Sequence, residues 1–202
     1  RMPTAITPSS SDPTLATYAS PIGRLTLAAR SGALVGLWVA GQHFFGSSYA
    51  IDEAVARSAL DLTSPNSREA VRAAAEWDEA DALALRAAAA WLDGYFAGEA
   101  PSPVCVPIAP AGTDFQQRVW AAMDAIPHGA TRTYGQIATT LRGAGVPASA
   151  QAVGGAVGRN PLLIIRPCHR VVAASGPGGY AAGAEAKAWL LAHEAATASS
   201  AS

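Results

Sequence analysis

A proline-rich segment near the middle of the chain limits how this sequence can fold. Residues 100–112 contain four prolines, and proline neither donates a backbone hydrogen bond nor fits inside a helix. We therefore expect a linker with a short extended piece. It divides the 202-residue chain into two domains, residues 14–108 and residues 112–197, each long enough to bury a small core.

Short β-type runs open the first domain. They occupy Leu15–Ser20, Arg24–Arg30 and Leu34–Ala40, and the turn signal Pro21-Ile22-Gly23 separates the first two. Because the runs follow one another so closely, they predict an antiparallel meander.

The rest of the first domain is less uniform. Over Ala80–Phe96 the apolar residues recur at spacings of three and four, which predicts a helix. Gly98 follows as a stop signal. A weaker pattern favours a short helix over Arg68–Trp77, and residues 41–65 have no clear period.

The second domain is expected to be mainly helical. Thr113 and Gln116 form a capping-box pattern at the start of a helix. Short helices over Tyr134–Leu141 and Ala148–Val157, joined by Gly143–Pro147, resemble a helix-turn-helix.

Two further segments complete the second domain. Leu162–Ile165 is apolar and is expected to be a strand. Ala184–Ala195 is expected to be the last helix, because Trp189, Leu190 and His193 recur at helical spacing.

Composition excludes several classes of protein. Half of the residues are hydrophobic and 14% are charged, as in a globular chain. Two cysteines cannot form a disulfide framework, and the scattered histidines predict no metal site. No apolar run is long enough to span a membrane. These features favour a reducing, cytoplasmic location.

Charge is unevenly distributed along the chain. The net charge is −1, which argues mildly against tight charge-driven binding of DNA. From Gly112 onward, however, seven Arg and Lys residues face four Asp and Glu residues. If nucleic acid binds, the second domain is the expected contact.

The segment Pro167-Cys168-His169-Arg170-Val171 carries the most chemistry. A neighbouring imidazole can take the proton of a thiol, lower its pKa and leave a thiolate, which attacks carbon readily. A Cys-His pair alone is also compatible with a buried structural cysteine beside an unrelated histidine.

The same segment resembles the active-site signature of O6-alkylguanine-DNA alkyltransferases. Further resemblances to this family extend over most of the chain outside residues 41–75 and the tails. They lie at Ser20–Leu27, Gly36–Trp38, Gly112–Trp120, Thr133–Ala138, Gly179-Tyr180 and Lys187–Glu194. The resemblance implies an α+β fold, with a small N-terminal antiparallel sheet and helix (RNase H-like) and a C-terminal helix-turn-helix or winged-helix-like domain.

The resemblance also implies a reaction. Cys168 would take an alkyl group irreversibly from O6-alkylguanine or O4-alkylthymine in double-stranded DNA, with no cofactor and as a monomer. His169 would act as the base through a water molecule, and Glu194 would orient His169. Tyr134 would help to protonate the departing base, and Asn160 would fix the joint between the recognition helix and the active-site strand.

Other residues are assigned to binding by the same resemblance. The expected DNA contacts are Gln151, Ala152, Gly154, Arg159, Tyr134 and Arg170. The expected substrate pocket contains Arg166, Pro167, Tyr180 and Ala181.

Three departures from the family bear on the substrate. Gln151 stands where the family has an Arg that fills the space left by the extruded nucleotide, and Gln is shorter and uncharged; Arg159 or Arg142 could substitute for it. Arg166 replaces an aliphatic residue and must reach solvent, an acidic partner or a ligand. Ala181 and Ala182 replace a Ser and a Gly.

These departures keep two alternatives open beside DNA repair. One is a lesion-binding protein with weak repair, against which the presence of Cys168 argues. The other is a diverged member of the family that acts on a small-molecule alkyl donor.

Overall fold

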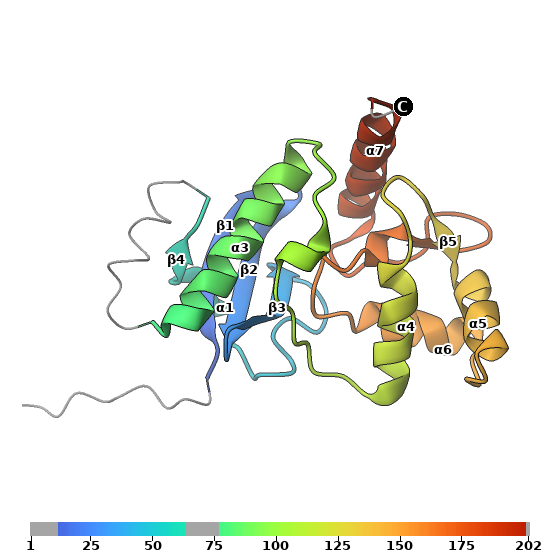
Figure 1. Ribbon diagram of the computed structural model, residues 1–202, viewed down its shortest axis with the longest axis horizontal. Helices are drawn as coiled ribbons and strands as arrows, with labels where there is room; N and C mark the ends of the chain where they lie inside the picture. The colour runs from blue at the N-terminus through green and yellow to red at the C-terminus, as the bar shows by residue number, and fades with distance from the viewer. Residues whose placement is uncertain (1–11, 64–76, 201–202) are drawn as a thin grey trace, which may run out of the picture.

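The computed structural model describes residues 12–63 and 77–200, and it contains a sheet-and-helix part beside a mainly helical part (Figure 1). The sheet has the strand order β3-β2-β1-β4. Its strands are β1 (Thr14–Ser20), β2 (Gly23–Arg30), β3 (Ala33–Val39) and β4 (Leu60–Asp61). The first three form the predicted antiparallel meander, and β4 runs parallel to β1.

Helix α3 (Glu79–Phe96) packs against this sheet, as Figure 1 shows. Asp78 caps it by accepting hydrogen bonds from the first turn, and its apolar stripe, which includes Leu85 and Leu92, is buried. The helix predicted from periodicity is therefore confirmed.

The segment without a clear period contains two short elements. Helix α1 (Glu53–Arg57) and strand β4 both lie within it, and each is too short to show a hydrophobic period. Most of the predicted helix over Arg68–Trp77 lies outside the described residues.

The second part contains the predicted helices. They are α4 (Asp114–Asp124), α5 (Tyr134–Gly143), α6 (Ala150–Gly158) and α7 (Ala184–Ser200). Thr113 and Thr133 form capping boxes at α4 and α5, and Ser149 caps α6. A small parallel pair, β5 (Arg132–Thr133) with β6 (Val171–Val172), holds the region before α5 against the region after Cys168.

The proline-rich segment is more than a linker. It contains a short 3-10 helix, η1 (Pro103–Cys105), and then pairs with β3, because Leu34 N donates to Pro107 O at 2.8 Å and Ala109 N donates to Leu34 O at 2.9 Å. Farther along β3, Leu37 N donates to Pro161 O at 2.7 Å. Both segments cover the open edge of the sheet.

The predicted strand over Leu162–Ile165 is wrong. Only Leu162 forms a β-bridge, to Leu37, and Ile164 has a φ of 67°, which breaks an extended chain. The side chain of Asn160 bonds to both backbone groups of Leu162 and to the carbonyl of Arg166. The segment therefore folds as a compact turn.

A single hydrophobic core joins the two parts. Leu37 and Leu92 from the first part and Trp120, Leu162 and Leu190 from the second belong to one buried cluster. The proposed domain limits thus separate two lobes that share a core. No helix among the described residues is long and apolar enough to cross a membrane.

We expect Leu37→Ala to destabilise both lobes together by about 3 kcal/mol, because it leaves a cavity in the shared core. Unfolding can be followed by hydrogen exchange in α3 and α4, with exposed Leu83→Ala as control. A loss of protection confined to α3 would contradict this expectation.

Candidate active site

Cys168 opens the short 3-10 helix η2 (Cys168–Arg170), and its free thiol forms part of a cavity wall. The residue is only 3% exposed, yet it lines a cavity of about 240 Å³. The other lining residues are His43, Phe44, Tyr134, Gly154, Val157, Gly158, Asn160, Leu163, Gly179, Tyr180 and Ala181. A small electrophile that enters this cavity can reach the sulfur.

Burial sets the resting state of the thiol. It raises the pKa of Cys168, although Asn160 and Lys187 act in the opposite direction. The expectation that the neighbouring imidazole lowers this pKa below its ordinary value is wrong for the resting site. Cys168 rests as a thiol, so a base must remove its proton when it reacts.

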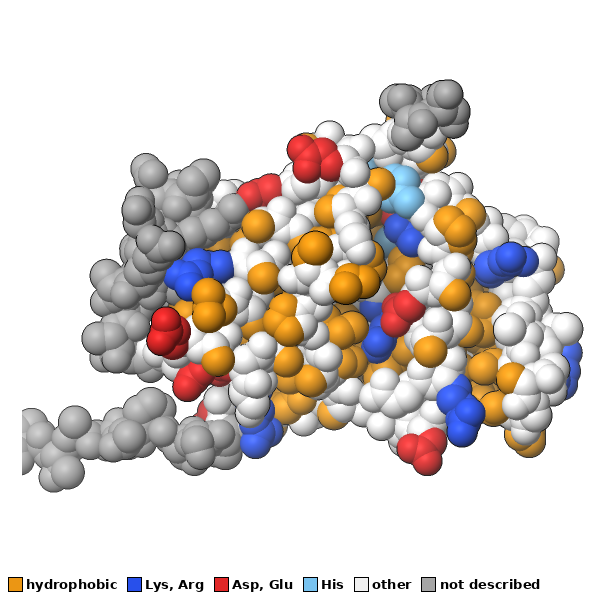
Figure 2. All heavy atoms as spheres, in the orientation of Figure 1, with side chains coloured by type: hydrophobic (Ala, Val, Ile, Leu, Met, Phe, Trp, Pro, Cys, Tyr) orange, Lys and Arg blue, Asp and Glu red, His pale blue; other side chains and the backbone are white. Residues whose placement is uncertain are grey.

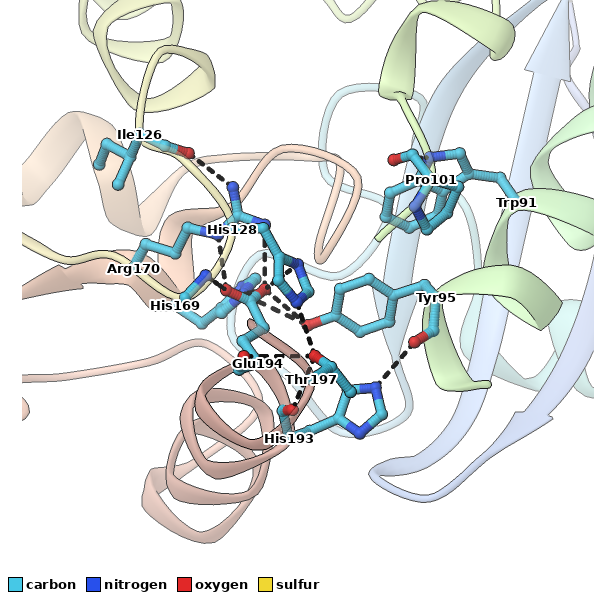
Figure 3. Close-up of polar contacts among 11 residues, drawn as sticks. Trp91, Tyr95, Pro101, Ile126, His128, His169, Arg170, His193, Glu194 and Thr197 are labelled. Carbon is cyan, nitrogen blue, oxygen red and sulfur yellow. Dashed lines mark hydrogen bonds and ion pairs between the residues drawn. The ribbon is translucent and has the colours of Figure 1, made fainter. Parts of the chain in front are cut away.

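His169 follows Cys168 directly in the chain and is bound to a glutamate. Its Nε2 lies 2.6 Å from Glu194 Oε1, and both side chains are buried (Figure 3). An ionised carboxylate only accepts hydrogen bonds, so Nε2 carries the proton and Nδ1 has a free lone pair. Among the described residues, Nδ1 has no hydrogen-bond partner. It can accept a proton.

Glu194 is held as an anion by several donors. Arg170 donates to both of its oxygens, at 2.8 and 3.0 Å, and Gly129 N donates to Oε2 at 3.0 Å. Burial would raise the pKa of Glu194, but the hydrogen bonds from His169 and Arg170 prevail and hold this pKa well below its ordinary value. The carboxylate therefore stays charged in the core.

The Arg170 side chain points inward. Its guanidinium binds Glu194 and donates to the carbonyl of Ile126 at 2.6 Å. The Arg170 side chain is 12% exposed, and its guanidinium can reach a phosphate only by leaving Glu194. In the structure Arg170 therefore stabilises the glutamate, and its predicted contact with DNA stays a prediction.

Arg166 and Pro167 do not line the cavity at Cys168. The Arg166 guanidinium pairs with Asp124 at 3.1 Å and lies over the ring of Trp120. This is the acidic partner that a buried arginine needs. Pro167 lines a separate, larger cavity of about 520 Å³, which Cys168 does not line. Both predicted pocket assignments are therefore corrected.

Asn160, Tyr134, Tyr180 and Ala181 do surround the cavity. Asn160 also fixes the turn that leads to Cys168. Burial raises the pKa of Tyr134 and that of Tyr180, with a further contribution from the nearby Cys168. Both phenols therefore keep their protons and can act as donors.

The predicted contacts on helix α6 lie outside the core. Gln151 and Ala152 are exposed, and a β-carbon at Gly154 would lie 3.8 Å from the Tyr134 ring. Arg159 follows the helix at its far end, with its guanidinium 5.0 Å from the ring centre of Phe44. Arg142 is bound to Ala148 O.

Sequence reasoning missed several residues of the site. His43 and Phe44 come from the segment without a period and form one wall of the cavity. Lys187 is buried, and its Nζ donates to Val171 O at 2.6 Å and to Gly179 O at 3.1 Å. The only signal in the sequence for these residues was the presence of a lysine, Lys187, on the apolar side of α7.

The described residues contain no cluster of side chains suited to a metal ion. The fold and the site together define a two-lobed protein that places a buried thiol, a histidine and a glutamate beside a helix-turn-helix. On the face shown in Figure 2, acidic side chains gather mainly over the first lobe.

Comparisons with known proteins agree with this description. The family model "6-O-methylguanine DNA methyltransferase, DNA binding domain" matches residues 114–196. A methylated-DNA–protein-cysteine methyltransferase of Mycolicibacterium paratuberculosis is 38% identical over 88% of this chain and 90% of its own length. One from Methanosarcina acetivorans is 50% identical over 53% of this chain and 67% of its own.

Solved structures are also similar. The Mycobacterium tuberculosis O6-methylguanine methyltransferase is 36% identical and has a TM-score of 0.67, with 92% of this chain and 94% of that chain covered. The same enzyme in complex with DNA gives a TM-score of 0.65, with 91% and 94% covered. The chain belongs to the methylated-DNA–protein-cysteine methyltransferase family.

Glu194 also links stability to pH. Because its pKa in the folded chain lies below the ordinary value of 4.5, its stabilisation is present above that pH and is lost as the pH falls below it. We expect Glu194→Gln to lower the free energy of unfolding by about 3 kcal/mol at neutral pH. The free energy of unfolding of this variant should also fall less as the pH is lowered. Urea unfolding at several pH values tests this, with exposed Glu185→Gln as control.

Proposed function

We propose that this protein repairs DNA by transferring an alkyl group from O6-alkylguanine to its own Cys168. O4-alkylthymine is a further substrate of the same chemistry. The observation that carries the proposal is the thiol in a cavity wall, directly followed by a histidine that binds a buried glutamate.

The proposed transfer balances in protons and electrons. His169 Nδ1 takes the thiol proton through a water molecule, and the sulfur attacks the alkyl carbon. The S–C bond forms as the C–O6 bond breaks, and guanine leaves with the electron pair. Tyr134, whose phenol stays protonated, donates a proton to the guanine anion. The proton that His169 took from the thiol then returns to Tyr134, so the net result is one proton lost by the thiol and one gained by guanine.

DNA enters this proposal through the helix-turn-helix. An alkylated O6 is hidden inside a duplex, so the nucleotide must turn outward to reach the cavity. The small exposed residues of α6, Ala152 and Gly155, allow the helix to approach the DNA backbone closely. Every proposed catalytic group comes from one chain, so the reaction needs no second copy.

The Cys168 adduct is the direct test. After incubation with O6-benzylguanine, we expect intact-mass spectrometry to show one added benzyl group. Peptide mapping should place it on Cys168, because the sulfur lines the cavity and the thioether is stable. Cys168→Ala should remain unmodified, and Cys105→Ala should react like the natural chain. Modification of Cys105 alone would rule out the proposal.

Substitution of Gln151 distinguishes repair of duplex DNA from a reaction with a free alkylated base. We expect Gln151→Arg to speed methyl transfer from duplex DNA about tenfold, because a planar cation can stack and bind phosphate. The reaction with free O6-benzylguanine should not change. Single-turnover kinetics with both donors measure this.

Gln151→Lys adds the charge without the planar group and serves as control. An equal gain with lysine would make the effect one of charge alone. No gain with either variant, together with efficient reaction of the free base, would favour a small-molecule alkyl donor.

A further inference from the structure

Tyr95 reaches the glutamate from the other lobe. It lies in the last turn of α3, and its buried hydroxyl donates to Glu194 Oε1 at 2.8 Å (Figure 3). The same oxygen binds His169 Nε2 at 2.6 Å. The other side chains that donate to this carboxylate, those of His169 and Arg170, belong to the second lobe.

The Tyr95 ring is held on more than one side. It stacks on Trp91 with centroids 5.2 Å apart and an interplanar angle of 16°, and Trp91 Nε1 donates to Pro101 O at 3.1 Å. The backbone carbonyl of Tyr95 accepts a hydrogen bond from His193 Nε2 at 2.7 Å. The hydroxyl is therefore positioned by α3, by the proline-rich segment and by α7.

Tyr95 stays a donor under all ordinary conditions. Burial and then the charge of Glu194 raise the pKa of Tyr95 far above its usual value. A buried phenol that always carries its proton next to a carboxylate donates a permanent hydrogen bond to it.

We propose that Tyr95 is a positioning residue for proton transfer from Cys168: its hydroxyl fixes the Glu194 oxygen that faces His169 and tunes how strongly that oxygen attracts the imidazole proton. The assignment builds on the proposed role of Cys168 as acceptor. It gives the first lobe a part in positioning the groups that transfer the proton.

The proposal has a directional consequence. A carboxylate that loses a donor becomes a stronger acceptor toward its remaining partners. His169 then takes up a proton at higher pH, and a protonated His169 cannot accept the thiol proton. In a plot of the Cys168 reaction rate against pH, the fall in rate on the acid side (the acid limb) should therefore move to higher pH. The other titratable groups that face this pair are unchanged; they are His128, Arg170, Tyr180 and Lys187.

Tyr95→Phe removes the hydroxyl and keeps the ring. Tyr18→Phe is the matched control, because the Tyr18 hydroxyl donates to Asp93 Oδ1 on the same helix α3, also at 2.8 Å. Each variant loses one tyrosine–carboxylate hydrogen bond, and only the first touches Glu194. Thermal unfolding of both variants reports any purely structural loss.

Iodoacetamide is the probe of Cys168 reactivity, because it alkylates the thiol without depending on recognition of an alkylated guanine. The Cys168 sulfur displaces iodide from the acetamide carbon while the thiol proton passes to His169. Peptide mass spectrometry follows Cys168 across a pH series, and exposed Cys105 is the reference within each sample. For Tyr95→Phe we expect a rate about tenfold lower, equal to about 1.4 kcal/mol, and an acid limb shifted upward. Tyr18→Phe and Cys105 should show neither change.

An unshifted acid limb in Tyr95→Phe, or an equal shift in Tyr18→Phe, would overturn the assignment. If Tyr95→Phe does not fold, a ring-fluorinated tyrosine at position 95 gives the opposite perturbation. A more acidic phenol donates more strongly, so the limb should move to lower pH, and no movement would contradict the proposal. If the unchanged protein reacts with iodoacetamide but not with O6-benzylguanine, the proposal that alkylguanine is the alkyl donor fails. The pH series would still decide the role of Tyr95 in that case.

Discussion

The ionised carboxylate of Glu194, 1% exposed in the core, is the constraint on which the site depends. An unpaired charge at this depth would cost several kcal/mol, roughly enough to unfold a small protein. The cost is offset by Tyr95 from α3, Gly129 from the turn after α4, and His169 and Arg170 from η2. Elements distant in sequence must therefore assemble before the charge can be buried.

This requirement explains why the two lobes are not independent. The edge of β3 pairs with the proline-rich segment and with the turn after α6, and the end of α3 is bonded to α7 through Tyr95 O and His193. The turn before Cys168 is in turn fixed by Asn160. The position of the sulfur thus depends on the sheet through this chain of hydrogen bonds.

Local rules predicted the regular elements well. The meander, α3 and the capping box at Thr113 follow from alternation, helical period and side-chain caps, which are encoded in neighbouring residues. The Leu162–Ile165 turn was not predictable in this way. Its backbone groups are satisfied by the Asn160 side chain and by β3, and an apolar run alone does not distinguish that arrangement from a strand.

The site was predictable in part, by resemblance more than by pattern. Cys168, His169 and Glu194 lie together, but the direction of the Arg170 guanidinium depends on a carbonyl 44 residues earlier in the chain. The place of Tyr95 depends on lobe packing, and that of Phe44 on a segment with no period. Such long-range contacts leave no trace in local spacing.

A protonated resting thiol suits an acceptor that is consumed by its reaction. A permanent thiolate would react with any electrophile that entered the cavity, and each event would waste one molecule of protein. Burial keeps Cys168 as a thiol, whereas Cys105 is exposed to solvent. In the proposed transfer, reactivity appears only when an alkyl carbon sits against the sulfur and His169 takes the proton. Selectivity would then come from the distance between proton, base and carbon rather than from a more reactive sulfur.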